Sequence, residues 1–367
     1  MMEQSHNEPI KVAIRGAGGL LGHRLLREIL NSQPDIDVSA VVLGTDEDSF
    51  RRFEIARYGL DEKEKDIKIF IDTSRKNIRK LKGAWGTSFE LLPLDQSFGE
   101  LGKTDAIVDT AILPGKDNLA DFYRTYSAKK PIIHQSGTHP LHAPIAPPFE
   151  PPGTEDGSLN YRQGNCLVSG VAPILNAVRS KITDIRLGLV VQRQTRLNAY
   201  TLRDNLADTI MDPTLEEYVK ETVSGLLPSL DKDNIEARVF QVPGLDYYLC
   251  TFEFNLSESV SRDQFLEILR NQPRIKFAPA SIPISTGQLE QKLREQCISL
   301  NIPLQPIVCF TCPGGIEVEG QKVVVRAAFY SKLITMIPNI DSIRALVRGI
   351  SMEESMKQTD ENIGYKK

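Results

Sequence analysis

The chain has 367 residues, more than a single hydrophobic core usually organises, so its length predicts two domains. Charged residues make up 25% and hydrophobic residues 41% of the chain, and the net charge is −4; these values are typical of a soluble globular protein and argue against nucleic acid or an anionic membrane as a partner. A polar first segment, the absence of any apolar run of ~20 residues, and five scattered cysteines favour a cytoplasmic protein with free thiols and no membrane span.

Residues 10–14, with the sequence IKVAI, form an apolar run that predicts a buried strand, and the segment GAGGLLG follows shortly after it. Apolar residues then recur at helical spacing. Strand, glycine-rich turn and helix in this order are typical of a dinucleotide-binding site, because glycines let the backbone approach a pyrophosphate at a helix N-terminus. The cofactor-binding candidates in this turn are Gly16, Ala17, Gly19, Leu20 and Leu21. The alternative is a tight turn that binds nothing.

A second predicted strand, residues 38–44, ends just before the acidic segment TDEDS. An acidic side chain about 20 residues beyond the glycines can bind a ribose hydroxyl of NAD and repel the 2′-phosphate of NADP. Asp46 is the candidate for this role, so it favours NAD over NADP as the cofactor. An exposed acidic loop explains the same segment equally well.

Predicted strands at 105–115 and 131–137 alternate with predicted helices, and this rhythm is typical of a doubly wound parallel sheet of the Rossmann type in an α/β protein. Ligands of such sheets bind at the carboxyl ends of the strands. The residues that we therefore expect to face the cofactor are Thr110, Ala111, Gln135, Ser136 and Gly137.

Three of the five histidines, His134, His139 and His142, lie close together in the sequence. Their spacing fits no zinc-binding pattern and His134 falls within a predicted strand, so we expect no metal site. His139 follows the end of that strand and is a candidate for the substrate site. The Pro- and Gly-rich residues 143–158 fit either an interdomain linker or an ordered loop.

Beyond residue 166 the predicted strands become longer and alternate in character, which favours a mixed or antiparallel sheet with helices on one face, an α+β catalytic domain. The open face of that sheet predicts an oligomer interface. Ser261 fits the N-cap of a helix, and Gly320 fits the turn of a hairpin. The expected domains are a dinucleotide-binding domain at 1–165, a catalytic and oligomerisation domain at 166–335, a closing helix at 336–350 that returns to the first domain, and a frayed polar tail at 351–367.

Three cysteines invite a functional interpretation. Cys166, in the segment NCLVSG, lies ahead of an apolar helical run that begins near Ala172, and it is either a nucleophile or a small buried hydrophobic residue. Cys309 and Cys312 form a C-x-x-C pair, but Pro-Gly-Gly follows it and the chain has no second pair. This context favours two ordinary thiols in or near a strand.

Six segments of the chain follow one another in the order typical of one family: DAIVDT, HQSG, NCLVSG, SVSRDQFLEILRNQPRI, STGQLEQKLRE and MIPNIDSIRAL. From Ile10 to about Arg348 the chain distantly resembles the archaeal-type (type II) glyceraldehyde-3-phosphate dehydrogenases. Its glycine turn looks more like that of aspartate-semialdehyde dehydrogenases. The resemblance implies an NAD(P)-dependent enzyme with a small-molecule aldehyde substrate, assembled as a homotetramer.

In that family a cysteine attacks the aldehyde, hydride passes to the nicotinamide, and phosphate cleaves the resulting thioester. The resemblance implies this role for Cys166, with Ser169 in place of a threonine of the family's pattern near the substrate. Such a thiol needs a lowered pKa, which a helix N-terminus or a nearby base can supply. The helix that is predicted to begin near Ala172 would contribute part of this effect.

Two departures from the family concern its base and its phosphate site. The family's catalytic histidine has no counterpart in the segment LADTIMDPTLEEYV. Glu216 or Glu217 could take its place as the base, or both could lie on a solvated helix face. Gln192 and Arg193 stand where the family has paired arginines, so Arg193 is the remaining candidate for binding a phosphate.

A retained cysteine among altered neighbours supports two interpretations. In the first, the chain is an active NAD(P)-dependent aldehyde dehydrogenase with a changed substrate, a phosphorylated or acidic aldehyde. In the second, it is an inactive relative that keeps the fold for cofactor binding or assembly. Retention of Cys166 and the glycine turn favours the first interpretation, because more than one kind of neighbour can activate a cysteine.

Overall fold

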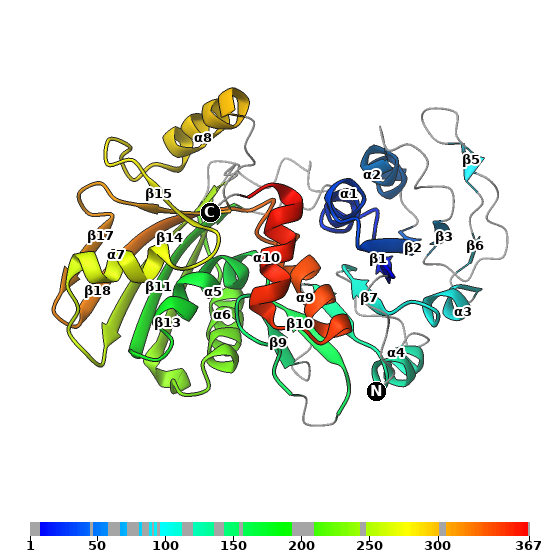
Figure 1. Ribbon diagram of the computed structural model, residues 1–367, viewed down its shortest axis with the longest axis horizontal. Helices are drawn as coiled ribbons and strands as arrows, with labels where there is room; N and C mark the ends of the chain where they lie inside the picture. The colour runs from blue at the N-terminus through cyan, green and yellow to red at the C-terminus, as the bar shows by residue number, and fades with distance from the viewer. Residues whose placement is uncertain are drawn as a thin grey trace. The chain divides into compact units, whose positions relative to one another are not determined.

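The computed structural model describes residues 8–44, 47–57, 67–71, 81–82, 88–89, 92–93, 96–111, 120–135, 143–153, 157–192, 209–242, 247–300 and 306–365. The chain divides into two compact units (Figure 1). The first unit consists of Met1–Asn165 and Met336–Ile363, and the second of Cys166–Thr335 and Gly364–Lys367. The first unit is therefore assembled from two segments that are distant in the sequence.

Eight strands form one parallel sheet in the first unit, in the order β6-β3-β2-β1-β7-β8-β10-β9. They are β1 (Ile10–Arg15), β2 (Ile36–Leu43), β3 (Lys68–Ile71), β6 (Leu92–Pro93), β7 (Ala106–Asp109), β8 (Ile132–Gln135), β9 (Ala143–Ile145) and β10 (Asn160–Gln163). The strand order reverses at β1, which is where ligands bind in doubly wound sheets. A separate antiparallel pair joins β4 (Leu81–Lys82) to β5 (Ser88–Phe89).

Helices cover both faces of this parallel sheet. They are α1 (Gly22–Ser32), α2 (Glu47–Arg57), α3 (Ser97–Leu101), α4 (Ala120–Ser127), α9 (Ile337–Arg348) and α10 (Met352–Ile363). Ile14 of β1 belongs to a core cluster with Leu25 of α1 and Ile340 of α9. Ala13, which points to the other face because side chains alternate along a strand, belongs to a cluster with Tyr126 of α4. The predicted Rossmann-type fold is confirmed.

The second unit contains a mixed sheet in the order β12-β13-β11-β14-β18-β16-β15, with β17 paired to β18. Its strands are β11 (Ile182–Gln192), β12 (Ile210–Met211), β13 (Ile235–Val242), β14 (Tyr247–Leu256), β15 (Ile275–Ala278), β16 (Ile307–Phe310), β17 (Ile316–Glu319) and β18 (Lys322–Tyr330). Its helices are α5 (Cys166–Val178), α6 (Pro213–Leu226), α7 (Arg262–Arg270), α8 (Thr286–Leu300) and the 3-10 helix η3 (Lys232–Asn234). The predicted mixed α+β arrangement is confirmed.

The two faces of the mixed sheet carry different helices. Gly170 of α5 lies so close to Phe329 of β18 that a Cβ atom at position 170 would be 2.5 Å from the phenyl ring. The preceding residue of β18, Ala328, points to the opposite face, where it shares a core cluster with Leu289 of α8. The expectation of one open face is therefore wrong for the part of the sheet that α8 covers.

Two local sequence predictions are confirmed in the second unit. The Ser261 side chain accepts a hydrogen bond from the backbone N–H of Gln264 at the start of α7, and the Gln264 side chain accepts one from the backbone N–H of Ser261, which completes a capping box. Gly320 has φ +64° at the turn between β17 and β18, which pair as an antiparallel hairpin. Glycine adopts this left-handed conformation without a steric cost.

The tail prediction for residues 351–367 is wrong, because Met352–Ile363 forms helix α10. Met352 and Met356 of this helix belong to a core cluster with Ile145 of β9 and Tyr161 of β10. Two apolar residues four positions apart make a narrow stripe that a polar composition hides. The segment 143–158 begins with strand β9, which pairs with β10, so its first three residues belong to the sheet.

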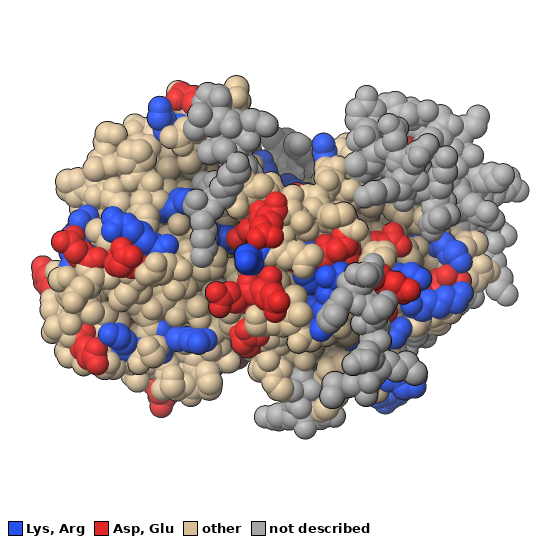
Figure 2. Space-filling view, viewed as in Figure 1, with Lys and Arg blue, Asp and Glu red and all other residues tan. Residues whose placement is uncertain are grey.

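The surface carries charges of both signs, and the helices are short. On the face drawn in Figure 2, basic and acidic side chains lie interspersed. Among the described elements α8 is the longest helix, with 15 residues. No helix in the described ranges combines the length and the apolar character that crossing a membrane requires.

Candidate functional site

The glycine turn between β1 and α1 is closely packed against the end of β7. Gly16 has φ +78°, and a Cβ atom there would lie 2.7 Å from Oγ1 of Thr110 and 2.9 Å from the backbone N of Ala111. The Thr110 hydroxyl donates to the carbonyl oxygens of Arg15 at 2.8 Å and Gly16 at 3.1 Å. Thr110 therefore holds the turn, and only glycine fits position 16 in this conformation.

The turn presents backbone N–H groups at the start of α1. The N–H of Gly19 closes the turn onto the carbonyl oxygen of Gly16 at 2.8 Å, and the N–H groups of Gly16 and Ala17 bind the carbonyl oxygen of Val42. Within the described residues, the N–H groups of Leu20 and Leu21 have no hydrogen-bond acceptor. Unpaired N–H groups at a helix N-terminus form a site that favours an anion.

An arginine and a histidine contact this turn. The Nε–H of Arg52 on α2 donates to the carbonyl oxygen of Gly18 at 2.6 Å, and Nδ1 of His23 lies 2.7 Å from the carbonyl oxygen of Gly19. Burial lowers the pKa of His23, and the positive charges of Arg24 and Arg52 lower it further. The local charge therefore adds to the preference of the turn for an anion.

A buried ion pair lies at the carboxyl ends of β1 and β7, and sequence reasoning missed it. Nη1 of Arg15 is 2.8 Å from Oδ2 of Asp109, and both side chains are almost fully buried. The Tyr123 hydroxyl donates to the same Oδ2 at 2.8 Å, and the backbone N–H of Ala111 donates to Oδ1 at 3.0 Å. Burial raises the pKa of Tyr123 well above its usual value, so the phenol stays protonated as a donor. These bonds fix the two strand ends beside the glycine turn.

Gln135 lies at the end of β8 as predicted, but its side chain is buried inside the first unit. Its Nε2–H donates to the carbonyl oxygen of Gly164 at 3.3 Å, and its Oε1 accepts a hydrogen bond from Nδ2 of Asn339 on α9. The side chain thus joins α9 to the segment that precedes Cys166. Five other candidates lie outside the described residues: Asp46, Ser136, Gly137, His139 and Arg193.

Cys166 is the first residue of α5 and is partly buried. Its Sγ lies 3.7 Å from the hydroxyl oxygen of Tyr248 on β14. Burial raises the pKa of the Cys166 thiol, while the hydrogen bond to Tyr248 and the backbone N–H groups of Cys166 and Leu167 act in the opposite direction. The helix begins at Cys166 and not near Ala172, as was expected from the sequence. Its N-terminal N–H groups lower the pKa of the thiol, but burial outweighs this effect.

Tyr248 is a candidate that sequence reasoning missed. It lies 82 positions after Cys166 in the chain, and a tyrosine in an apolar strand is an ordinary core residue. The one feature of the sequence that could have pointed to Tyr248 is its hydroxyl group, since a buried tyrosine hydroxyl usually has a hydrogen-bond partner.

The two glutamates proposed as alternative bases are engaged elsewhere. Oε1 of Glu216 accepts a hydrogen bond from the backbone N–H of Val239 on β13 at 3.1 Å, and Oε2 lies 3.8 Å from Arg238. Glu217 is exposed and pairs with Lys232. In the described part of the chain, neither carboxylate has a contact with Cys166.

Two other residues of the NCLVSG segment, Ser169 and Gly170, are buried. Ser169 is buried in α5, one turn after Cys166. Gly170 allows α5 to approach Phe329. The segment therefore fixes the position of the helix that carries the cysteine, as well as supplying the cysteine itself.

All five cysteines are free thiols. Cys309 lies in β16 and Cys312 just after it, both buried, and burial raises the pKa of Cys309 to about 12. They are ordinary core thiols, as predicted. Within the described ranges, no group of three or more His, Cys, Asp or Glu side chains is placed to hold a metal ion.

Comparisons of the sequence with known proteins find archaeal dehydrogenases. The chain is 25% identical to glyceraldehyde-3-phosphate dehydrogenase of Archaeoglobus fulgidus over 366 residues, which cover 98% of each chain. It is 22% identical to the enzyme of the same name from Saccharolobus islandicus over 364 residues, again covering 98% of each chain. The enzyme of the same name from Aeropyrum pernix is 28% identical over 158 residues, which cover 42% of this chain and 44% of the relative. No family model matches the chain.

Comparison of the structure with solved structures finds a dehydrogenase fold. Aspartate semialdehyde dehydrogenase II from Vibrio cholerae, solved in complex with ASA, aligns with a TM-score of 0.54 and 11% sequence identity, and the alignment covers 97% of this chain and 99% of that one. The fold is thus that of a known dehydrogenase. The distant resemblance predicted from the six sequence segments is confirmed by these relatives.

Proposed function

We propose that the chain is an NAD(P)-dependent aldehyde dehydrogenase of the glyceraldehyde-3-phosphate dehydrogenase type. Its substrate would be a phosphorylated or acidic aldehyde, which it oxidises through a thiohemiacetal and a thioester on Cys166. The similarity to relatives named glyceraldehyde-3-phosphate dehydrogenase, over nearly the whole chain, supports the reaction type. The fold likeness to an aspartate semialdehyde dehydrogenase is consistent with it.

The position of Cys166 is the observation that carries the proposal. The thiol begins a helix, is partly buried, and has a hydroxyl group at hydrogen-bond distance. A purely structural cysteine needs none of these features, because it packs as a small apolar residue. Backbone N–H groups at a helix N-terminus stabilise a thiolate once it forms.

The glycine turn of the first unit fits a dinucleotide. Position 16 has no room for a Cβ atom, so the backbone there lies as close to β7 as glycine permits. The N–H groups of Leu20 and Leu21 are available to phosphate oxygens, and Arg52 adds positive charge to the turn. A nicotinamide cofactor held by this turn would accept a hydride from the substrate carbon. Asp46 favours NAD over NADP as that cofactor.

The residues of the chain would act in sequence. The Cys166 thiolate adds to the carbonyl carbon, so that a C–S bond forms and the C=O π electrons move to oxygen, which takes a proton from water. After the substrate carbon has lost hydride and its hydroxyl group has released a proton to solvent, Cys166 carries a thioester. Cys166 then leaves as a thiolate when phosphate or water attacks the acyl carbon.

Substrate recognition rests on expected neighbours of the cysteine. Ser169, Arg193 and His139 are the proposed contacts, and an arginine or a histidine suits a phosphate or carboxylate group of the aldehyde. Glu216 is not the base that we favour, because its carboxylate already binds β13. We also propose that the protein acts in the cytoplasm as a homo-oligomer, a tetramer by resemblance.

One observation favours a second function, an inactive relative with a cofactor-binding or assembly role. Burial raises the pKa of the Cys166 thiol, so a substantial thiolate population at neutral pH needs a compensating interaction. Such a protein would bind NAD or NADP through the glycine turn but would oxidise no aldehyde.

A spectrophotometric screen tests the proposal. The full chain is mixed with NAD⁺ or NADP⁺ and with a panel of aldehydes that includes glyceraldehyde 3-phosphate and aspartate semialdehyde, with and without phosphate. We expect reduction of the cofactor with one acidic aldehyde, and a loss of at least about 10³-fold in kcat for Cys166→Ser, because the covalent route disappears.

Cys297→Ser is the matched control, since Cys297 is also a partly buried free thiol but lies on α8. We expect it to keep wild-type activity. Cofactor binding without oxidation of any aldehyde would favour the inactive relative, and equal activity of Cys166→Ser and the wild type would refute the cysteine mechanism.

A further inference from the structure

We propose that the Tyr248 hydroxyl is a catalytic group that donates a hydrogen bond to the Cys166 thiolate and so keeps the sulfur ready to attack. This inference rests on the proposed function, because it assigns a partner to the same cysteine. No family histidine or free carboxylate is needed for it. The contact that suggests it is the 3.7 Å separation of Sγ and the hydroxyl oxygen, within hydrogen-bond range for sulfur.

The positions of both side chains are fixed by the packing of the second unit. Tyr248 is opposite Phe329 in the antiparallel pair of β14 and β18, so both side chains lie on the same face of the sheet. Phe329 is the residue against which Gly170 of α5 packs. One close contact thus places the helix that begins at Cys166 beside the strand position that carries the tyrosine.

Tyr248 is also positioned by its own surroundings. Its side chain is only 3% exposed, so the hydroxyl is directed by the packing around it. The preceding residue, Tyr247, points to the other face, where it packs with Tyr330 and the α8 cluster. Tyr247 and Tyr248 are adjacent in the sequence but project from opposite faces of the sheet.

A hydroxyl group suits both protonation states of the sulfur. In the thiol state, the S–H donates to the hydroxyl oxygen of Tyr248. When the thiol has released its proton to water, the tyrosine O–H turns and donates to the negatively charged sulfur. A phenol can act as donor or acceptor, and a hydrogen bond to a charged partner is roughly twice as strong as a neutral one. The bond therefore stabilises the thiolate more than the thiol.

A hydroxyl group donates a hydrogen bond to a thiolate without adding negative charge, whereas a carboxylate would repel it. Several charged groups on the neighbouring helices and strand have partners of their own. On α6, Glu216 binds β13 and Glu217 pairs with Lys232, and on α7 Arg270 pairs with Glu267. On β18, Arg326 binds the carbonyl oxygen of Gly314 and pairs with Glu317. Among the described residues, the Tyr248 hydroxyl is the side-chain group that lies within hydrogen-bond range of the Cys166 sulfur.

The pH profile of Cys166 alkylation tests this role. Native full-length wild type and Tyr248→Phe are labelled with iodoacetamide over a range of pH, and the rate at Cys166 is followed by mass spectrometry. We expect the apparent pKa of Cys166 to rise in Tyr248→Phe and labelling at neutral pH to fall roughly tenfold, because the thiolate loses a charge-assisted hydrogen bond. At high pH the two rates should converge.

Tyr247→Phe is the matched control, since it removes a hydroxyl from the same strand on the opposite face, and we expect its profile to equal that of the wild type. If iodoacetamide does not reach the thiol, the thiolate absorbance is titrated instead. The contribution of Cys166 is the part of that absorbance that is missing in Cys166→Ser. Superimposable titrations of Tyr248→Phe and wild type overturn the inference by either method.

Activity assays separate this inference from the proposed function. If an aldehyde is oxidised, we expect Tyr248→Phe to lower kcat at neutral pH, with recovery at higher pH and little change in KM for the cofactor. Oxidation with no effect of Tyr248→Phe would keep the proposed function and reject the tyrosine. A shifted Cys166 titration without oxidation of any aldehyde would keep the Tyr248 contact and reject the dehydrogenase.

Discussion

Gly170 shows how a single residue determines where the candidate nucleophile lies. A Cβ atom at this position would be 2.5 Å from Cδ2 and 2.7 Å from Cγ of Phe329. Phe329 is fully buried, so its ring has no free volume into which to move. Glycine is required here by the close approach of α5 to β18.

We predict that Gly170→Ala lowers the free energy of unfolding by about 1–3 kcal/mol, the usual cost of overpacking a core. Urea denaturation measures it. Gly287→Ala is the matched control, because Gly287 is also helical, in α8, and a Cβ atom there meets nothing within 4 Å. That variant should be as stable as the wild type or slightly more stable, since alanine favours a helix. Equal stability of both variants would show that α5 can shift away from β18.

The candidate site was only partly predictable from individual residues. Gly16 was predictable because its spacing to neighbouring glycines is local, and the structure gives it the left-handed conformation that such a turn uses. Tyr248 was not, because strand pairing brings it to Cys166 from 82 positions away. Glu216 was a reasonable alternative base by position, but a sequence does not reveal that β13 already occupies the carboxylate.

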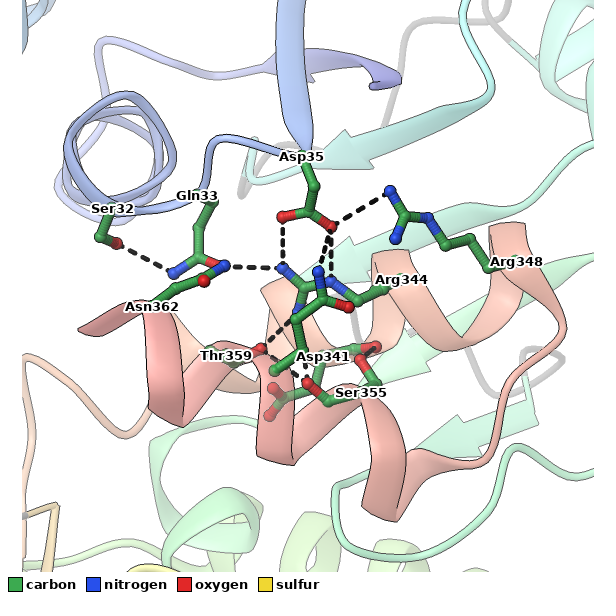
Figure 3. A network of polar contacts seen from close by, with 10 residues as sticks. Ser32, Gln33, Asp35, Asp341, Arg344, Arg348, Ser355, Thr359 and Asn362 are labelled. Carbon is green, nitrogen blue, oxygen red and sulfur yellow. Dashed lines mark hydrogen bonds and ion pairs between the residues drawn. The ribbon is translucent and has the colours of Figure 1, made fainter. Parts of the chain in front are cut away.

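At the scale of elements, a buried arginine holds α10 against the rest of the first unit (Figure 3). The side chain of Arg344 on α9 is fully buried, and its Nε and Nη2 lie 2.8 Å from the two carboxylate oxygens of Asp35. Nη2 also donates to Gln33, and Nη1 donates to the carbonyl oxygen of Ser355 and the hydroxyl of Thr359 on α10. One guanidinium group thus joins the start of β2 to α9 and α10. Hydropathy does not reveal such a polar anchor, so the sequence predicted a frayed tail.

We predict that Asp35→Asn destabilises the first unit by about 3 kcal/mol, because it leaves the buried Arg344 without its counter-charge. Asp37→Asn is the matched control, since Asp37 lies two residues further along and is exposed. It should change the stability by less than about 0.5 kcal/mol. Chemical denaturation followed by circular dichroism compares the variants, and equal midpoints for both would reject the anchoring role.

The pH dependence of that difference provides an internal check. Burial alone raises the pKa of Asp35, but the hydrogen bonds and charge of Arg344 outweigh it, so the pKa lies below the ordinary value of 3.8. A carboxyl group whose pKa is lowered on folding adds stability above its unfolded pKa and loses that contribution as the pH falls through its folded pKa. The stability gap between wild type and Asp35→Asn should therefore be constant near neutral pH and shrink below about pH 4. A gap that persists at lower pH would indicate a cause other than the carboxylate charge.

For the whole molecule, the division into two units has a consequence for folding. The chain leaves the first unit after Asn165 and returns to it at Met336. The returning segment supplies Ile340 and Ile343 to the core cluster around β1. The points at which the chain leaves and re-enters the first unit lie close together, because Gln135 forms hydrogen bonds with both Gly164 and Asn339. The alternation of strands and helices predicted the parallel sheet, and the helix at 336–350 was expected to return to the first domain, although periodicity alone does not show which sheet a distant helix completes.

We therefore predict that residues 1–165, joined to residues 336–363 by a short Gly-Ser linker, fold as one cooperative unit, whereas residues 1–165 alone do not. Loss of Ile340 and Ile343 removes about 3–6 kcal/mol of apolar burial, which is comparable to the whole stability of many domains, about 5–15 kcal/mol. Urea unfolding followed by circular dichroism distinguishes the two, and Ile343→Asp in the fused chain should abolish its transition, because that residue is fully buried. A cooperative transition of residues 1–165 alone, equal to that of the fused chain, would show that the returning helices are accessory to the fold.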